Sequence, residues 1–155
     1  MRYTVLCFAL MLLPTAAFAA EGRWTAEMQE DEGGPAMVAS VSAKPVGDLT
    51  PTLSLMCAGT EGVNLRYEMP MGDAEPASEA DIMLKTDKAE ITQHVVFEEM
   101  DGAFAAYFQP TDPTIDLLKT GKEVVVSVSP GKGPALTFPL TGSSKAIDTL
   151  LKSCN

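Results

Sequence analysis

The sequence predicts a mainly β protein, an antiparallel β-sandwich that ends in a short C-terminal helix. Glycine and proline recur about every ten residues, and short segments of alternating apolar and polar residues lie between them, as in all-β domains. Near the end the apolar spacing becomes helical, because Ile147, Leu150, Leu151 and Cys154 stand at i, i+3, i+4 and i+7. These two observations favour a sandwich closed by one helix over alternating βαβ units.

Residues 1–19 are typical of a secretory signal peptide. They combine an early positive charge, an apolar segment from Val5 to Leu13 and the small-x-small pattern Ala17-Phe18-Ala19. The apolar segment is shorter than the ~20 residues that a membrane span requires, which disfavours the alternative of an uncleaved anchor. We expect cleavage after Ala19 or Ala20, with residues 20–155 forming a single domain in the periplasm or outside the cell.

Two cysteines remain after this processing, Cys57 and Cys154, and an oxidising compartment favours one disulfide between them. Strand alternation places Cys57 on the same face as Leu49, Leu53 and Leu55. Helical spacing places Cys154 on the apolar stripe of the last helix, so both sulfurs should point into the core. A redox-active or metal-binding pair is the alternative, but the chain has no Cys-x-x-Cys motif.

Alternation of apolar and polar residues predicts the strands. In order, they are Arg23–Gln29, Met37–Ala43, Leu49–Cys57, Val63–Met69, Ile82–Thr86, Ile91–Met100, Ala103–Phe108, Glu123–Ser129 and Ala135–Leu140. In the fourth, Val63, Leu65 and Tyr67 should face the core, and Asn64 and Arg66 should face outwards.

Turn and cap residues separate these strands. Asp101-Gly102 predicts a two-residue type I′ hairpin, a turn in which both central positions need positive φ. Pro113 to Lys119 predicts a short helix that ends at Gly121. The final helix should run from Ser144 to Cys154, with Ser143 or Ser144 as its N-cap.

The chain is acidic, with a formal net charge of −10. Nucleic acids and anionic membranes need Lys and Arg to neutralise phosphate, so both are poor partners for this chain, and we expect no nucleic-acid binding. The charge fits a basic protein partner, and it also fits simple solubility. No segment after the signal peptide is long and apolar enough to predict a transmembrane helix.

The sequence gives no pattern for catalysis. His94 is the only histidine, and no Gly-x-Ser-x-Gly accompanies it, so we interpret it as an exposed strand residue and not as the base of a triad. Glu98 and Glu99 are adjacent in a predicted strand and should point to opposite faces, which excludes an acid/base dyad. We therefore expect no enzyme and no catalytic residue.

Metal and cofactor signals are equally sparse. Met69-Pro70-Met71 has thioether spacing that Cu(I) can use, but no second Met-x-Met or His-rich segment accompanies it. No phosphate-binding glycine loop, dinucleotide fingerprint or calcium loop occurs. We expect neither a metal nor a cofactor.

Loops on a rigid β scaffold are the usual place for recognition. We therefore predict binding residues at Asp73 and Glu75, in the loop from Gly72 to Ala80, and at Glu99 and Asp101, at the hairpin turn.

Roughly the last forty residues of the chain resemble the C-terminal half of two exported bacterial families. The resemblance lies in Asp116–Gly121, Val124–Val128, Thr137–Ser143 and Ala146–Cys154, together with Leu55-Met56-Cys57 and an early tryptophan, Trp24. One is the invasion-associated locus B family, and the other is the periplasmic accessory protein found with type VI secretion systems. Gly142-Ser143 stands where the first family usually has Gly-Phe, and that family's further cysteine pairs are missing here. The terminal cysteine and the Cys57 strand are more similar to the pattern of the secretion-associated family.

This resemblance implies a periplasmic β-sandwich with a C-terminal helix and an accessory role in secretion or host invasion. We therefore expect a non-enzymatic binding protein of the envelope whose partner is another envelope or secreted protein. Two alternatives stay open: an inhibitor of a cationic hydrolase such as lysozyme, and an envelope hydrolase without a recognisable motif.

Overall fold

The computed structural model describes residues 22–31, 34–69, 76–129 and 133–154. In these segments nine strands form one antiparallel sheet in the order β1-β2-β3-β4-β7-β6-β5-β8-β9. The strands are β1 (Thr25–Asp31), β2 (Gly34–Ser42), β3 (Thr52–Cys57), β4 (Val63–Glu68), β5 (Glu79–Lys85), β6 (Glu90–Glu98), β7 (Ala103–Phe108), β8 (Glu123–Ser129) and β9 (Leu136–Pro139). The helices are the 3-10 turn η1 (Gly59–Glu61), α1 (Pro113–Thr120) and α2 (Ser143–Ser153).

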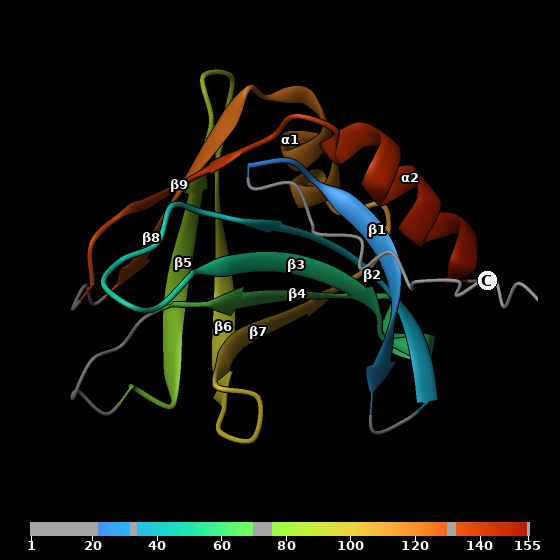
Figure 1. The fold of residues 1–155 in the computed structure, drawn as a ribbon, viewed down its shortest axis with the longest axis horizontal. Helices are drawn as coiled ribbons and strands as arrows, with labels where there is room; N and C mark the ends of the chain where they lie inside the picture. The colour runs from blue at the N-terminus through green and yellow to red at the C-terminus, as the bar shows by residue number, and fades with distance from the viewer. Residues whose placement is uncertain (1–21, 32–33, 70–75, 130–132, 155) are drawn as a thin grey trace, which may run out of the picture.

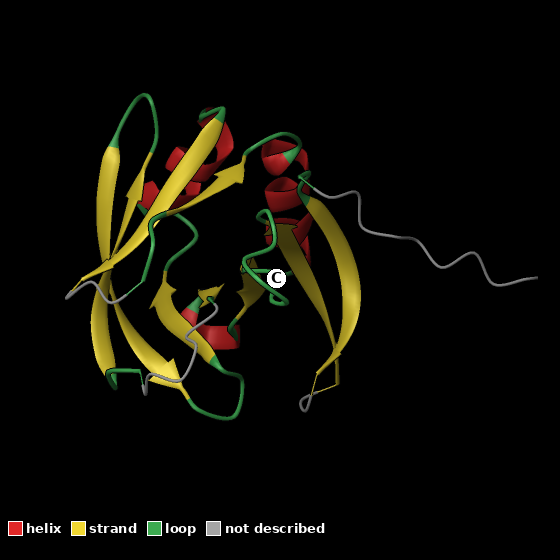
Figure 2. Cartoon of the chain, turned by 60° about the vertical axis from the view of Figure 1, so that its left-hand side comes forward, coloured by secondary structure: helices red, strands yellow, loops and turns green. Residues whose placement is uncertain are grey.

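The sheet is open and strongly curved, so that its two halves lie across from each other. Figure 1 shows β3 and β4 running in a different direction from β5 and β6, and Figure 2 shows the same halves from the side. The N–H of Trp24 donates to the carbonyl of Thr141 at 3.0 Å, which joins the chain before β1 to the chain after β9. The predicted mainly β, antiparallel architecture is confirmed, and its two layers come from one continuous sheet.

The core lies between these two halves and α2. The alternation predicted for β4 is confirmed, since Val63, Leu65 and Tyr67 are completely buried, and Leu53 and Leu55 of β3 are buried beside them. Burial of one such side chain contributes about 1.5–3 kcal/mol to folding. The inward face is therefore closed, and any site for a partner must lie on the outward face or at the turns.

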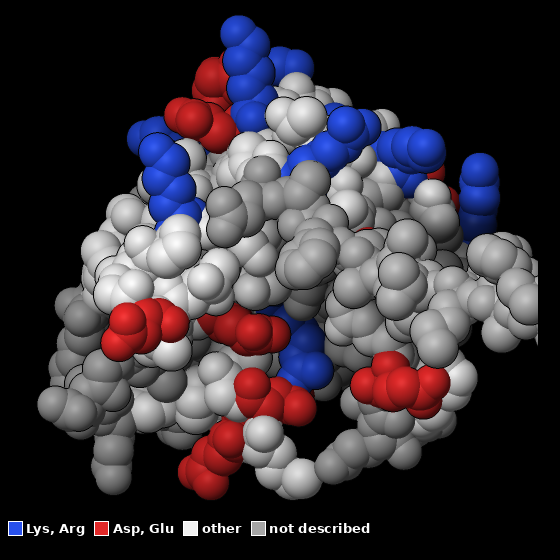
Figure 3. Space-filling model, in the orientation of Figure 1, with Lys and Arg blue, Asp and Glu red and all other residues white. Residues whose placement is uncertain are grey.

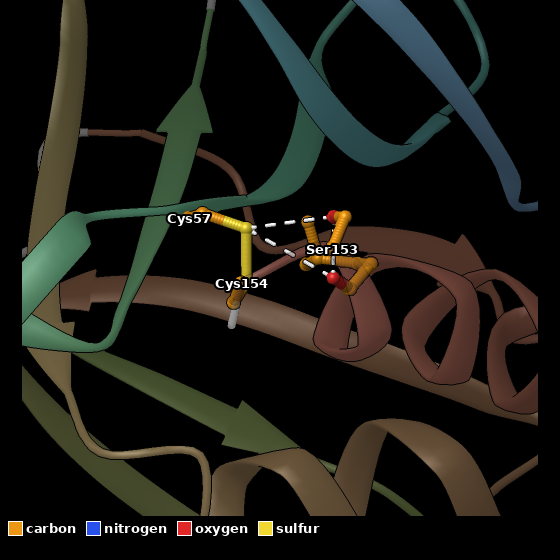
Figure 4. Close-up of a disulfide and its surroundings, with 4 residues drawn as sticks. Cys57, Ser153 and Cys154 are labelled. Carbon is orange, nitrogen blue, oxygen red and sulfur yellow. Dashed lines mark hydrogen bonds between the residues drawn. A yellow bond between two sulfur atoms is a disulfide. The ribbon is translucent and has the colours of Figure 1, made fainter.

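The predicted disulfide between Cys57 and Cys154 is present and joins the end of β3 to the end of α2. Figure 4 shows the bond, with Ser153 beside it. The two Cα atoms lie 5.2 Å apart, and Cys57 Sγ lies 3.6 Å from Ser153 Oγ. α2 packs its buried Ala146, Ile147 and Leu150 over the β1–β3 side of the sheet, so the bond fixes this cover at its C-terminal end.

Helix α1 begins as its sequence predicts and is tied to the sheet by a polar side chain. Asp112 is its N-cap and accepts from the N–H of Thr114 at 2.9 Å, with Pro113 in the first turn. Gln93 of β6 donates to the Asp112 carboxylate at 3.1 Å and to the Thr114 hydroxyl at 2.7 Å. Neither α1 nor any other helix of the described segments is both long and apolar enough to cross a membrane.

Three local predictions are wrong. Leu49 was expected on the buried face, but β3 begins only at Thr52, and Leu49 is 53% exposed in a preceding turn. Neither Ser143 nor Ser144 caps α2, because Gly142 takes the N-cap position with a φ of 84° that favours glycine.

The third wrong prediction concerns the turn between β6 and β7. Glu98 pairs with Ala103, so four residues connect the strands and not two. Gly102 has a φ of 63°, but Asp101 keeps a negative φ, which a type I′ turn does not permit. The carboxylate of Asp101 instead reaches back to Arg66 on β4.

Tyr67 provides a pH-dependent test of the core. Its ring lies edge-on to Phe138, with centroids 6.0 Å apart, and its buried hydroxyl has no hydrogen-bond partner among the described residues. Burial raises the pKa of Tyr67 to about 12. The native state therefore holds this proton more tightly than the unfolded state, and stability is lost as the pH rises from about 10 towards 12, by up to about 3 kcal/mol.

We expect Tyr67→Phe to abolish this alkaline loss and to leave stability at pH 7 unchanged or higher by up to about 1 kcal/mol, because an unpaired hydroxyl is removed. Urea denaturation at neutral and alkaline pH measures both effects. Tyr107→Phe, at a half-exposed position, is the control and should keep the alkaline loss. An equal alkaline loss in wild type and Tyr67→Phe would contradict the assignment.

Candidate functional site

Polar side chains of β4 lie on the outward face of the sheet, between the neighbouring strands β3 and β7. Asn64 of β4 pairs with Met56 of β3 on one side and with Tyr107 of β7 on the other. In the next row Arg66 pairs with Ser54 and Ala105. Because both neighbours of Arg66 are small, its long side chain has room to lie along the sheet towards the β6–β7 turn.

Arg66 is the centre of an ionic network. Its Nη2 donates to Glu98 Oε2 at 3.1 Å and also to Asp101 Oδ2, and its Nη1 contacts Met56 Sδ at 3.7 Å. The Tyr107 hydroxyl donates to the other oxygen of Glu98 at 2.7 Å. Only 14% of the Arg66 side chain is exposed. The network thus ties β4 to β6, to β7 and to the turn between them.

These residues border an open pocket of about 570 Å³, which we call the Arg66 pocket. Its lining consists of Met56, Cys57, Ala58, Asn64, Arg66, Glu98, Glu99, Met100, Asp101 and Tyr107. Figure 3 shows most acidic side chains of this face in its lower part, around one basic side chain and where Figure 1 places the β6–β7 turn, and most basic side chains in its upper part. The pocket therefore lies in the acidic region of the surface.

The electrostatics of the Arg66 pocket are negative in spite of its arginine. Three carboxylates and one guanidinium in the lining give a formal charge of −2. Partial burial raises the pKa of neighbouring Glu68; Arg66 opposes this shift and Asp101 adds to it. A cation is therefore favoured in this environment over an anion.

Two hydrogen-bond acceptors at the pocket have no donor within the described part of the chain. Asn64 is only 5% exposed, and its buried Oδ1 accepts no hydrogen bond. Glu99, at the rim, makes no hydrogen bond or ion pair with a described residue, in contrast to Glu98 and Asp101. Thus Arg66 engages Glu98 and Asp101, and the acceptors of Asn64 and Glu99 remain without a donor from the described residues.

Apolar surface adjoins these charges. Met100 is 85% exposed, Tyr107 is 49% exposed, and Val96, one strand further along the same face, is 48% exposed. Exposed methionine and tyrosine beside charged groups are typical of protein-recognition surfaces.

Two of the four predicted binding residues lie at the pocket, and the other two lie outside the described residues. Glu99 and Asp101 lie together at the pocket, whereas Asp73 and Glu75 lie outside the described residues. The sequence interpretation missed Arg66, Asn64, Met56 and Tyr107, which strand pairing brings to the same place. It also placed Glu98 and Glu99 in one strand, with their side chains on opposite faces. In the structure β6 ends at Glu98 and Glu99 belongs to the turn, so both residues line the pocket.

The candidate residues for catalysis and metal binding lie elsewhere. His94 is exposed on β6, as predicted, with Nδ1 3.2 Å from Asp81 and Nε2 3.8 Å from Glu79, and it does not line the pocket. Pro70 and Met71 of the Met-x-Met segment lie outside the described residues. Within the described ranges, no three His, Cys, Asp or Glu side chains are placed to hold a metal ion.

Comparison with known proteins identifies the fold. No protein-family model matches the chain, and no curated protein matches it in sequence. Among solved structures, the crystal structure of invasion associated protein B from Bartonella henselae is similar, with a TM-score of 0.59 at 15% sequence identity. The match covers 87% of this chain and 96% of that chain. At this identity the similarity is one of fold, and it agrees with the first of the two resemblances noted in the sequence.

Proposed function

We propose that this chain is an exported, non-enzymatic accessory protein of the bacterial envelope that binds another protein at the Arg66 pocket. The main support for this proposal is the pocket itself. Its negative charge and its acceptors without donors lie beside the exposed side chains of Met100 and Tyr107. Export is supported by the signal-like N-terminal sequence and by the Cys57–Cys154 bond, since disulfides persist in oxidising compartments.

A binding role is favoured over hydrolysis by the way the carboxylates are used. Both oxygens of Glu98 are engaged, one by Arg66 and one by Tyr107, and Asp101 is held by the same guanidinium. His94 lies outside the pocket, so no imidazole stands near these carboxylates as a general base. The fold shared with an invasion-associated protein supports an accessory role in secretion or host invasion as the setting.

Photo-crosslinking in the bacterium that makes the protein tests this proposal. Met100 would be replaced by the photoreactive residue p-benzoylphenylalanine, because its side chain projects from the pocket rim into solvent. Met28 on β1 is the matched control, since it is also an exposed methionine, at 59%, but lies away from the pocket. We expect a discrete envelope or secreted protein joined to position 100 only. No adduct, or the same adducts from both positions, would contradict the proposal.

The negative pocket also favours a second candidate, an inhibitor of a cationic hydrolase. In that case the purified protein should inhibit lysozyme, and salt should reverse the inhibition because screening weakens contacts between exposed charges. Full lysozyme activity at a large excess of the protein would remove this candidate and leave the first unaffected.

A further inference from the structure

We propose that the Arg66 pocket receives a lysine or arginine side chain of the partner. This inference rests on the proposed function and specifies the chemistry by which the pocket would select its partner. It follows from three properties of the lining: the sign of its charge, the acceptors that its own arginine leaves free, and the apolar groups at its mouth.

The sign of the charge disfavours the more obvious ligand of an arginine, a carboxylate or phosphate. The guanidinium of Arg66 already contacts Glu98 and Asp101, so its positive charge is matched inside the pocket. Glu99 adds a further negative charge at the rim. Both carboxylates contact Nη2, whereas Nη1 contacts only Met56 Sδ and Nε has no partner among the described residues. An entering anion could therefore find a donor, but it would meet a lining of net negative charge, whereas an entering cation meets charge of opposite sign.

The free acceptors point to a donor-rich group. Asn64 is 95% buried at the pocket wall, and its Oδ1 has no partner within the described residues. A buried acceptor without a donor destabilises the protein, but Oδ1 is shielded from solvent in this orientation, so a ligand can donate to it only after the amide group turns. Rotation about the last side-chain bond of Asn64 exchanges its oxygen and nitrogen, which lets the oxygen turn towards the pocket. An ammonium or guanidinium group has several donors and no acceptor, which suits both Asn64 and Glu99.

The apolar part of the lining suits the rest of such a side chain. Met56, Met100 and Tyr107 border the pocket, and the methionines are flexible, polarisable groups that adapt to a methylene chain. Lysine and arginine bury their aliphatic stems against such groups while the charged end reaches polar partners. The volume of about 570 Å³ is sufficient for one long side chain and part of its neighbours.

Peptide titration tests the inference on the protein exported to and purified from the periplasm of an expressing bacterium. Three capped peptides of the form Gly-Leu-X-Leu-Gly would carry arginine, lysine or citrulline at X; citrulline has nearly the shape of arginine without its charge. We expect the arginine or the lysine peptide, or both, to shift the amide resonances of Asn64, Glu99 and Asp101, and citrulline to leave them in place. Affinity should fall at least about fivefold between about 0.05 and 0.5 M NaCl.

Two variants and a matched control locate the binding. Glu99→Gln and Asn64→Leu should each weaken binding about three- to tenfold, the first by removing charge and the second by removing the buried acceptor. Glu79→Gln makes the same charge change at an exposed carboxylate outside the pocket, so its affinity should stay within about twofold. Thermal unfolding of each variant separates loss of binding from loss of folding.

The inference is overturned if citrulline binds as well as arginine, if Glu79→Gln weakens binding as much as Glu99→Gln, or if no peptide shifts the pocket resonances. Adducts at position 100 without any peptide shift would leave the proposed function standing and reject the cationic side chain. Peptide shifts without an adduct at position 100 would support the pocket's preference for a cation and count against the proposed function.

Discussion

Replacing Cys154 by serine lowers the free energy of unfolding by about 2–4 kcal/mol and loosens α2 before the rest of the fold. The bond closes a loop between positions 97 residues apart, for which the chain-entropy model gives at most about 4–5 kcal/mol. A helix of 11 residues is marginal without tertiary support, so α2 depends on this bond and on its buried stripe. Urea denaturation gives the stability, and hydrogen exchange of the α2 amides locates the loosening.

Ser153→Ala is the matched control for the disulfide variant. It removes the hydroxyl whose oxygen lies 3.6 Å from Cys57 Sγ and keeps the disulfide, so its stability should lie within about 0.5 kcal/mol of wild type. Thiol titration of the mature wild-type protein, denatured but not reduced, should find no free thiol. Two free thiols per chain, or exchange in α2 that is unchanged by Cys154→Ser, would contradict the role assigned to the bond.

The elements of this fold could be predicted from local sequence because apolar alternation and burial coincide. Val63, Leu65 and Tyr67 illustrate this. The disulfide partners do so in part, because two different periodicities pointed them at the core and both pack against it partly buried. The prediction failed where alternation continued past the end of a strand. Leu49 continues the apolar alternation of β3 towards the N-terminus. Pro51 stands between Leu49 and β3 and has no N–H to donate to a neighbouring strand, so the strand begins after Pro51, at Thr52.

The order of strands in the sheet could not be predicted in the same way. β4 pairs with β7 and β5 with β8, and these partners lie far apart in the chain. Alternation shows which face of a strand is apolar, but it contains no information on which strand lies beside it. The curvature that folds one sheet into two layers follows from this pairing, so it could not be predicted from the sequence either.

Only the turn residues of the candidate site could be predicted from the sequence. Glu99 and Asp101 were found because turn residues on a β scaffold are available for recognition. Asn64 and Arg66 were placed on the outward face correctly, but an outward residue is taken to be solvated, and these two are 5% exposed and 14% exposed in the side chain, respectively. Their burial depends on Met56, Tyr107 and the β6–β7 turn, which only non-local pairing brings to them.

Gly62 holds β4 against β7 at the upstream end of this site, and its replacement by alanine should be strongly destabilising. Its φ is 98°, a conformation that residues with a side chain rarely adopt. A Cβ there would lie 2.5 Å from the carbonyl oxygen of Phe108 and 3.2 Å from the Cα of Gln109. Both are backbone atoms at the end of β7, so they cannot move without disturbing the β4–β7 pairing that starts at Val63.

We therefore expect Gly62→Ala to lower the free energy of unfolding by roughly 2–4 kcal/mol, the sum of backbone strain and overpacking. Gly102→Ala is the matched control, because Gly102 also has a positive φ, 63°, but nothing lies within 4 Å of an added Cβ. It should lose only about 1 kcal/mol, the strain of a left-handed alanine. Urea denaturation of the two variants isolates the steric part, and amide resonances of Asn64 and Tyr107 should move in Gly62→Ala alone. Equal losses in the two variants would show that the approach of Gly62 to Phe108 does not hold β4 in place.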